Sequence, residues 1–496
     1  MSTTDEQQLE QIQNFEGKYP KQLWSLFFSE MWERFCFYGM RGMLTIFMVK
    51  ELLMDEKTAN LQYGATQAFV YAFTFIGGLF ADKILGFRKS LFWGGLLMIV
   101  GSCILAINPK DFFFYGISFT IVGTGFFKPN ISTMVGNLYK EGDSRRDAGF
   151  SLFYSGINIG ALLGGYLCIY VAKNYSWNMA FGFAAIVMTI SLITFIFTRK
   201  SLGPIGLSPF IKNGVDTGKK WMDVLVYIGS LAVIPAIMSM VSTPEYTDLF
   251  MYIIGPATIV YLLYEMSKLS WNENKKIIAA MVFILYSILF WAFFEQSGGS
   301  LNLFAANNLD NTVLGIKLDP NGVNNSSNSL FVILFAPLVG LAWIWLDKKR
   351  REPNTVIKFG LGFLFLSLAF YIFYSNRFFA NENGIASLDI FTLAYLTITF
   401  GELCLSPIGL SIMTKLAPKH LAGVMMGLWF LASAYGQYVA GILGAGMASE
   451  SPNATAAEKL ISYTEGYKQL GLYGLIAGLS LILISPWVRK MMQEVK

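Results

Sequence analysis

The chain has 496 residues, of which 54% are hydrophobic, 16% aromatic and only 14% charged, and its net charge is +5. A soluble domain carries about 25% charged residues, so this composition excludes an ordinary soluble protein and indicates an all-α integral membrane protein. The basic residues lie mainly in the loops between apolar runs. Their distribution therefore does not support nucleic-acid binding. The four cysteines lie in apolar runs without metal-ligand spacing and are interpreted as free packing thiols.

About fourteen apolar runs follow one another along the chain, each near the ~20 residues that cross a bilayer. They are predicted at 23–49, 63–81, 90–107, 112–131, 149–170, 179–198, 222–241, 249–264, 277–294, 329–346, 356–374, 390–414, 421–447 and 468–488. Lysines and arginines concentrate in alternate loops and at both ends. By the positive-inside rule, this asymmetry predicts that both termini are cytoplasmic.

The first run carries an unusual amount of charge. At helical pitch, Glu30, Glu33, Arg34, Tyr38 and Arg41 fall on one side of the helix, and the other side is apolar. Each unpaired buried ion costs several kcal/mol or more, so an ordinary core helix does not concentrate charge in this way. We expect this side to face a water-filled path through a helix bundle. A structural ion-pair lock between helices is the alternative.

Two further polar residues lie inside apolar runs of the first half. Lys128 precedes Pro129 in the fourth run, and a lysine there faces either a partner anion or a cavity, unless it extends toward the membrane interface. Asn158 follows several small residues in the fifth run, which allow helices to approach closely. An interhelical hydrogen bond and ligand contact are equally compatible with Asn158.

A Gly- and Pro-containing connector and two nearly uncharged apolar runs separate two groups of six runs. We interpret the two middle runs as an accessory hairpin outside two six-helix bundles, an arrangement typical of transporters with a central site. The predicted divisions are a cytoplasmic tail, an N-terminal bundle, a connector with the hairpin, a C-terminal bundle and a second tail, at 1–22, 23–200, 201–275, 276–490 and 491–496.

The second group of runs also carries buried charge. Glu295 ends the first run after the hairpin, Asn328 opens the next run, and Glu402 lies inside the run at 390–414. With the first half, this makes acids and bases nearly balanced inside the membrane, as a paired network needs. We expect Arg41, Lys128, Glu295 and Glu402 to converge on one solvated chamber.

Several functions are excluded or lack support. His420 is the single histidine, which excludes His-pair zinc sites and His-based triads. The sequence contains no Walker-type loop and no G-x-S-x-G or G-x-G-x-x-G motif. We therefore expect no enzyme activity and no cofactor or metal, and an ion gradient as the energy source. Moving one charge across ~100 mV releases about 2.3 kcal/mol.

Four stretches resemble one known family. Residues 30–39 resemble the E-x-x-E-R-F-x-Y-Y-G signature of the proton-dependent oligopeptide transporters, a branch of the major facilitator superfamily. Residues 123–130 read G-T-G-F-F-K-P-N, 153–160 read F-Y-x-x-I-N-x-G, and 401–411 read G-E-x-x-x-S-P-x-G-L-S, and all are similar to that family. The resemblance implies a major facilitator fold with the hairpin of bacterial members. It also implies symport of H⁺ with di- and tripeptides by alternating access. We expect the protein to lie in the inner membrane and to function as a monomer.

The resemblance also assigns roles to individual residues. The proton-coupling residues would be Glu30, Glu33, Arg34 and Glu295. The cations near the peptide carboxylate would be Arg41 and Lys128, and the groups near the peptide amino terminus would be Asn158, Asn328 and Glu402. The pocket-lining residues would be Tyr38, Tyr71, Trp291, Trp429 and Ser433. Our hypothesis for coupling is that ionised Glu295 and the peptide carboxylate compete for Arg41.

One position departs from the family pattern. The tandem tyrosine of the signature reads Phe37-Tyr38, and Phe37 offers no phenolic hydrogen bond. This departure puts in doubt one polar contact to the peptide backbone. Separately, a related substrate is an alternative, namely nitrate, a modified amino acid or a peptide-like drug. A peptide sensor without transport is a further alternative, and a membrane enzyme is the weakest one.

Overall fold

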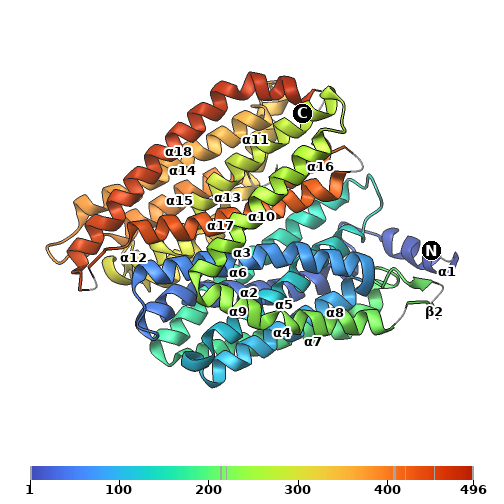
Figure 1. Ribbon diagram of the computed structural model, residues 1–496, viewed down its shortest axis with the longest axis horizontal. Coiled ribbons are helices and arrows are strands. Elements are labelled where there is room, and N and C mark those ends of the chain that lie inside the picture. The colour runs from blue at the N-terminus through green and yellow to red at the C-terminus, as the bar shows by residue number, and fades with distance from the viewer. Residues whose placement is uncertain are drawn as a thin grey trace. The chain divides into compact units, whose positions relative to one another are not determined.

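The computed structural model describes residues 3–212, 215–218, 220–405, 409–418, 421–451 and 453–493. These residues are overwhelmingly helical (Figure 1). Ser406 and Pro407 of the fourth family-like stretch, His420 and the last three residues of the predicted C-terminal tail lie outside the described residues.

The helices follow the predicted runs, except that the run predicted at 222–241 is two helices. The α-helices are α1 (Thr3–Gln13), α2 (Lys21–Lys50), α3 (Glu56–Phe80), α4 (Phe87–Ile107), α5 (Pro109–Gly136), α6 (Arg145–Asn174), α7 (Trp177–Thr198), α8 (Lys220–Ala232), α9 (Ile234–Ser242), α10 (Pro244–Met266), α11 (Trp271–Phe294), α12 (Ser300–Asn308), α13 (Pro320–Lys348), α14 (Thr355–Ser375), α15 (Leu388–Leu405), α16 (Gly409–Leu416), α17 (Ala422–Met447) and α18 (Ala456–Met492). The π-turn η1 (Ala81–Leu85) and the 3-10 turns η2 (Arg199–Leu202), η3 (Glu295–Gly298) and η4 (Asn376–Phe379) extend four of them. Among the described residues, eleven helical segments are long and apolar enough to cross a membrane.

Side-chain caps set several helix starts. Ser270 and Glu273 form a capping box at the start of α11, and Thr455 and Glu458 form another at the start of α18. Asp319 caps α13 by accepting a hydrogen bond from the backbone of Gly322. These contacts satisfy amide groups that have no partner inside the helix.

The chain divides into two compact units. Unit 1 comprises Met1–Met43 and Phe69–Ser242, and unit 2 comprises Leu44–Ala68 and Thr243–Lys496. Both α2 and α3 pass from one unit into the other. We describe each unit by itself, and the bundle and hairpin boundaries expected from the sequence remain predictions.

Unit 1 is held together by close helix contacts at glycines. A Cβ added to Gly160 of α6 would lie 2.1 Å from the carbonyl oxygen of Met31 in α2, and one added to Gly164 would lie 2.1 Å from that of Phe35. No side chain fits at such a distance, so these glycines let the α2 and α6 backbones touch. The small residues of the fifth run had predicted this close approach.

The turn between η1 and α4 lies against the connector of unit 1, which begins after α7. Gly86 has φ +78°, which favours glycine. Nearby, the Arg88 guanidinium donates a 2.7 Å hydrogen bond to the carbonyl oxygen of Ile205 and another to that of Gly203. Farther along, β1 (Ile211–Lys212) and β2 (Val215–Asp216) pair antiparallel.

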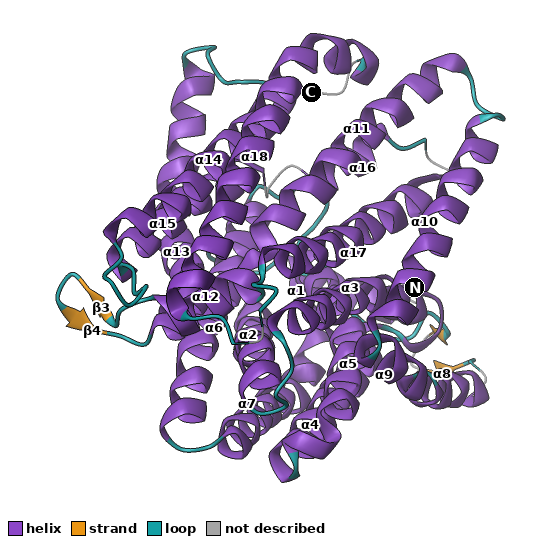
Figure 2. Ribbon diagram, turned by 60° about the vertical axis from the view of Figure 1, so that its left-hand side comes forward, coloured by secondary structure: helices purple, strands orange, loops and turns teal. Residues whose placement is uncertain are grey.

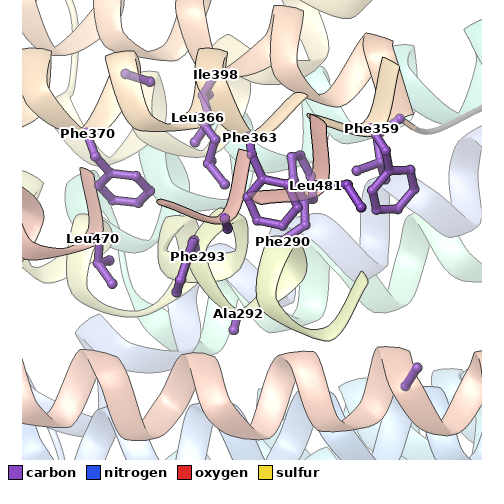
Figure 3. Packing of buried hydrophobic residues seen from close by; sticks show 14 of the residues in the cluster. Phe290, Ala292, Phe293, Phe359, Phe363, Leu366, Phe370, Ile398, Leu470 and Leu481 are labelled. Carbon is purple, nitrogen blue, oxygen red and sulfur yellow. The ribbon is translucent and has the colours of Figure 1, made fainter. Parts of the chain in front are cut away.

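Unit 2 has an aromatic core between α11, α14, α15 and α18, and Figure 3 shows part of it. The rings of Phe290 and Phe363 meet edge to face at 5.6 Å, and those of Phe283 and Phe359 do the same at 5.6 Å. Figure 1 shows α14 beside α18, against which it packs. Figure 2 shows the small hairpin of β3 (Thr312–Val313) and β4 (Ile316–Lys317) projecting from the loop before α13.

Candidate functional site

A charged cluster lies on α2 in unit 1. The Arg34 Nε is 3.1 Å from Glu30 Oε1, one turn away, and it donates a hydrogen bond to Glu33 Oε2. All three side chains are at most 2% exposed. Two carboxyl groups therefore share one guanidinium inside the protein. If both were ionised, a net negative charge would remain buried, which is strongly unfavourable unless a proton or another cation balances it.

The cluster has spare hydrogen-bonding capacity. Among the described residues, Glu30 Oε2, Glu33 Oε1 and Arg34 Nη2 are buried without a hydrogen-bond partner. The charge of Lys128 in α5 also acts on both glutamates. The ion pairs of Arg34 with Glu30 and Glu33 join residues of one helix. In this conformation the acids face protein rather than open water.

Phe37, the departure from the family pattern, lies beside the cluster. The Arg34 guanidinium carbon is 5.1 Å from the centre of the Phe37 ring, and Phe37 is 4% exposed. A cation over an aromatic face is stabilised, and more so when both groups are desolvated. Phe37 therefore supports Arg34 through its ring face.

The two other predicted cations of unit 1 also contact aromatic rings. Arg41 of α2 is 5.6 Å from the centre of the Tyr38 ring, and Lys128 Nζ of α5 is 4.6 Å from that of Tyr71. Both cations are half-buried. Helix α5 continues through Pro129, so the proline does not end the helix that carries Lys128.

Asn158 of α6 is buried, and its side-chain amide donates a 3.0 Å hydrogen bond to the carbonyl oxygen of Tyr154 one turn earlier. This bond stays within α6. The hydrogen bond donated by the Asn158 amide nitrogen is therefore not interhelical. Contact of Asn158 with a ligand remains a prediction.

In unit 2, an acid and an amide meet. Asn328 Nδ2 of α13 donates to Glu402 Oε2 of α15 at 2.8 Å, and it lies 3.2 Å from the hydroxyl of Thr399. Glu402 is 8% exposed. Glu295 lies where α11 passes into η3, is 6% exposed, and its charge acts on Glu402. Unit 2 thus brings Glu295, Asn328 and Glu402 within electrostatic reach of one another.

The predicted pocket residues of unit 2 lie on α11 and α17. Trp291 packs edge to face against Phe290 and Phe294, with ring centres 5.5 Å and 5.4 Å apart. Trp429 and Ser433 are one turn apart on α17, and the Ser433 hydroxyl donates to the Trp429 carbonyl oxygen at 3.2 Å. A Cβ added to Gly436 would lie 2.8 Å from the Trp291 Cβ, so α17 approaches α11 closely here.

Sequence reasoning missed two polar groups of unit 2. Thr399 precedes Glu402 by three residues, a helical spacing that would have placed both on one face. Asn302 of α12 is fully buried, and its Oδ1 lies within 3.2 Å of the side-chain amides of Asn321, Asn324 and Asn325 in α13. The asparagine-rich start of the run before Asn328 was the available signal.

The predicted site residues therefore form separate groups within each unit. The expected convergence of Arg41, Lys128, Glu295 and Glu402 on one chamber involves both units and remains a prediction. In the described part of the chain, no group of three or more His, Cys, Asp or Glu residues is arranged to hold a metal ion.

Comparisons with known proteins identify relatives over the whole chain. The model of the POT family matches residues 88–461. The peptide transporter YePEPT of Yersinia enterocolitica is 34% identical over 450 residues, covering 86% of this chain and 88% of that protein. The dipeptide and tripeptide permease B of Aeromonas hydrophila is 30% identical over 476 residues, covering 95% and 94%. A crystal structure of a mutant of the peptide transporter POT in complex with alafosfalin is similar with a TM-score of 0.83 and 33% identity, covering 99% of this chain and 100% of that chain.

Proposed function

Since this chain belongs to the POT family of membrane transporters, we propose that it imports di- and tripeptides together with protons by alternating access. In this proposal the protein lies in the inner membrane with both termini in the cytoplasm, works as a monomer and needs no cofactor beyond the proton gradient. The names of its relatives, a peptide transporter and a dipeptide and tripeptide permease, support the substrate class.

The observation that carries proton coupling is the buried pair of glutamates around Arg34. Because burial disfavours a surplus negative charge, the cluster favours holding one proton when it is closed off from water and Lys128 binds the peptide carboxylate instead of balancing the second acid. Opening the cluster to water would lower the cost of ionisation and let the proton leave. A proton taken up on one side and released on the other is the step that a symporter requires.

Peptides share a carboxylate and an ammonium group and differ in their side chains. In our proposal Arg41 and Lys128 bind the carboxylate, and Glu402 binds the ammonium while Asn328 fixes its orientation. The aromatic residues around these groups leave room for varied side chains. Such a site accepts many sequences because it recognises only the two ends.

The test is uptake of a labelled dipeptide by proteoliposomes with and without an inward proton gradient. Wild-type protein should accumulate the dipeptide only with the gradient. The Glu30→Gln variant retains a neutral Glu33–Arg34 pair that needs no proton. It should therefore keep exchange of peptide for peptide but lose accumulation against a gradient.

The matched control is Glu141→Gln, the same substitution at an exposed glutamate of unit 1, which should accumulate peptide like the wild type. Normal gradient-driven accumulation by Glu30→Gln would show that the cluster does not couple protons. Absence of dipeptide uptake by the wild type would overturn the proposal itself.

Competition separates the possible substrates. Dipeptides, tripeptides, a modified amino acid, alafosfalin and nitrate are added in excess to the same uptake assay. We expect di- and tripeptides to compete strongly. Competition by the modified amino acid or alafosfalin alone would instead indicate a peptide-like substrate, and binding without uptake would indicate a sensor.

A further inference from the structure

An apolar groove lies on unit 1, apart from the groups described above. It has a volume of about 460 Å³ and is formed by α3 with η1, α5 and α8. Its walls carry Phe73, Phe80 and Phe126 on one side and Trp221, Leu225 and Gly229 on the other. The rings of Phe80 and Phe126 are nearly parallel, and their centres are 6.4 Å apart.

Helix α8 is fastened to α4 by polar contacts. Lys89 Nζ is 2.6 Å from Asp223 Oδ2, and the indole nitrogen of Trp93 donates to the Ser230 hydroxyl at 2.9 Å. The ring of Trp93 also packs against that of Tyr227 at 4.6 Å. These contacts fix α8 in place against α4, and an adjoining side of the helix, which includes Ser230, lines the groove. The groove therefore belongs to the folded unit.

Several lining residues of the groove are exposed on the surface of the protein. Trp221 and Leu225 are each 56% exposed although they are apolar, and a Cβ added to Gly229 would meet no atom within 4 Å. In a protein that spans a membrane, such a surface faces lipid chains rather than water. The lining residues of α8 run from Trp221 to Ser230, a stretch that extends about 15 Å at ~1.5 Å per residue. One leaflet contributes about half of the ~30 Å hydrocarbon core, so the groove has the length of one acyl chain.

One end of the groove is basic. Lys83 directly precedes the lining residue Ile84, and Lys220 directly precedes Trp221; both lysines are exposed. Lys83 also lies 3.2 Å from the exposed Asp82. Together with Arg88 and Lys89, the bases at this end outnumber the acids Asp82 and Asp223. Clusters of this kind attract anionic headgroups, by about 1 kcal/mol for each lysine or arginine.

We propose that this groove is a specific site for an anionic membrane phospholipid. One acyl chain would lie along α8 over Phe80 and Phe126, and the phosphate would lie near Lys83 and Lys220. The occupant is a lipid rather than another protein because a leaflet-long apolar channel ends in a cluster of positive charge.

The experiment uses the full-length protein in phosphatidylcholine vesicles that contain a phosphatidylglycerol with a photoreactive diazirine in its acyl chain. After illumination, labelled peptides are identified by mass spectrometry. We expect labels on α3, α5 and α8, and competition by unlabelled phosphatidylglycerol but far less by phosphatidylcholine. In Lys83→Gln/Lys220→Gln, the preference for phosphatidylglycerol should fall roughly fivefold per lysine, as the ~1 kcal/mol for each implies. The paired control Lys348→Gln/Lys349→Gln, at the end of α13, should retain it.

Gly229→Leu tests the groove itself. The added side chain enters open space on a helix, where replacing glycine does not cost stability, and it should abolish labelling of the groove. Gly340→Leu is the matched control, since a Cβ there also meets nothing, and should label like the wild type. Labels spread evenly over all lipid-facing helices, or labelling unchanged by Gly229→Leu, would overturn the proposal. A change of oligomeric state in Gly229→Leu would assign the groove to a second copy of the chain instead.

Discussion

At the scale of single residues, Phe37 shows how one position can serve a different partner from the one its motif suggests. Without a hydroxyl, Phe37 offers only its ring, and the ring lies under Arg34 at 5.1 Å. The ring face therefore helps to hold the guanidinium between Glu30 and Glu33. This contact concerns the charged cluster and does not require substrate.

The role of this ring can be measured. Phe37→Leu removes the aromatic face and should lower the free energy of unfolding by about 1–2 kcal/mol, and it should also slow gradient-driven uptake. Phe37→Tyr retains the ring and should keep most of both. The measurements are thermal unfolding in detergent and uptake by proteoliposomes. Equal behaviour of the two variants would mean that the ring face does not support Arg34.

Asp55 lies between the first two predicted spans, and its ionisation should make the stability of the protein depend on pH. Partial burial acts to raise its pKa, but hydrogen bonds from the hydroxyl and backbone of Thr58, at 2.7 and 2.8 Å, outweigh it and hold the pKa below the ordinary 3.8. The lowered pKa means that ionised Asp55 stabilises the start of α3 above pH 3.8, and that this stabilisation is lost as the pH falls through the folded-state value.

Thermal unfolding should show this loss. At neutral pH, Asp55→Ala should lower the free energy of unfolding by about 0.5–1 kcal/mol. This is the lower range for a lost helix cap, because the site is exposed. The difference in the free energy of unfolding between wild type and Asp55→Ala should shrink as the pH falls below 3.8. Asp55→Asn keeps a cap that does not titrate, so its difference from Asp55→Ala should stay constant. A pH-independent difference for the wild type would contradict the assignment.

At the scale of elements, glycine contacts join α2 to α6. Gly160→Ala places a methyl group 2.1 Å from the Met31 carbonyl oxygen, so the helices must separate, which costs about 1–3 kcal/mol. Gly182→Ala is the matched control, because its methyl group would meet the Ala106 Cβ at an ordinary 3.6 Å. We expect a lower melting temperature in detergent for Gly160→Ala alone. Equal melting temperatures would show that α2 and α6 do not depend on this contact.

The predicted runs and the observed helices differ where local chemistry interrupts hydrophobicity. The run 222–241 is two helices, α8 and α9, separated at Val233, because Pro235 cannot donate to the preceding turn and clashes with it. Apolar content alone does not predict the break between α8 and α9. Conversely, α5 continues through Pro129, so a proline inside an apolar run has no single outcome.

At the scale of the whole molecule, one ionic network joins three helices of unit 2. Glu56 Oε1, at the start of α3, accepts from Lys459 Nζ of α18 at 2.6 Å and from Asn307 Nδ2 of α12 at 2.9 Å. Tyr463 donates to the other carboxylate oxygen. Glu56 is 8% exposed. These residues lie far apart in the sequence, so no local motif pointed to them.

A double-mutant cycle measures this network. Glu56→Gln should lower the free energy of unfolding by about 1.5–3 kcal/mol, the usual loss for hydrogen bonds to a charged group. Lys459→Met should cost less, since its side chain is 22% exposed. The double variant should be more stable than the sum of both losses predicts, by about 0.5–3 kcal/mol. Strictly additive losses would show that the two residues do not interact in solution.

The candidate site was predictable to the extent that it follows helical spacing. Glu30 and Arg34 are one turn apart, so their pairing on α2 is visible in the sequence. The partnership of Asn328 with Glu402 was suggested only by resemblance to a family, because contacts between helices distant in sequence do not follow from periodicity. The apolar groove of unit 1 could not be predicted, since it depends on which side of α8 faces α4.

Helix α3 belongs to both units, since the boundary between them falls at Ala68 and Phe69 inside one unbroken helix. An unbroken helix is stiff, because backbone hydrogen bonds join each turn to the next. In the transport cycle that we propose, α3 must either bend near its middle or lose the contacts that Glu56 makes with Lys459 and Tyr463 in unit 2. In this proposal, each turnover then includes the free energy needed to bend α3 or to break the contacts of Glu56.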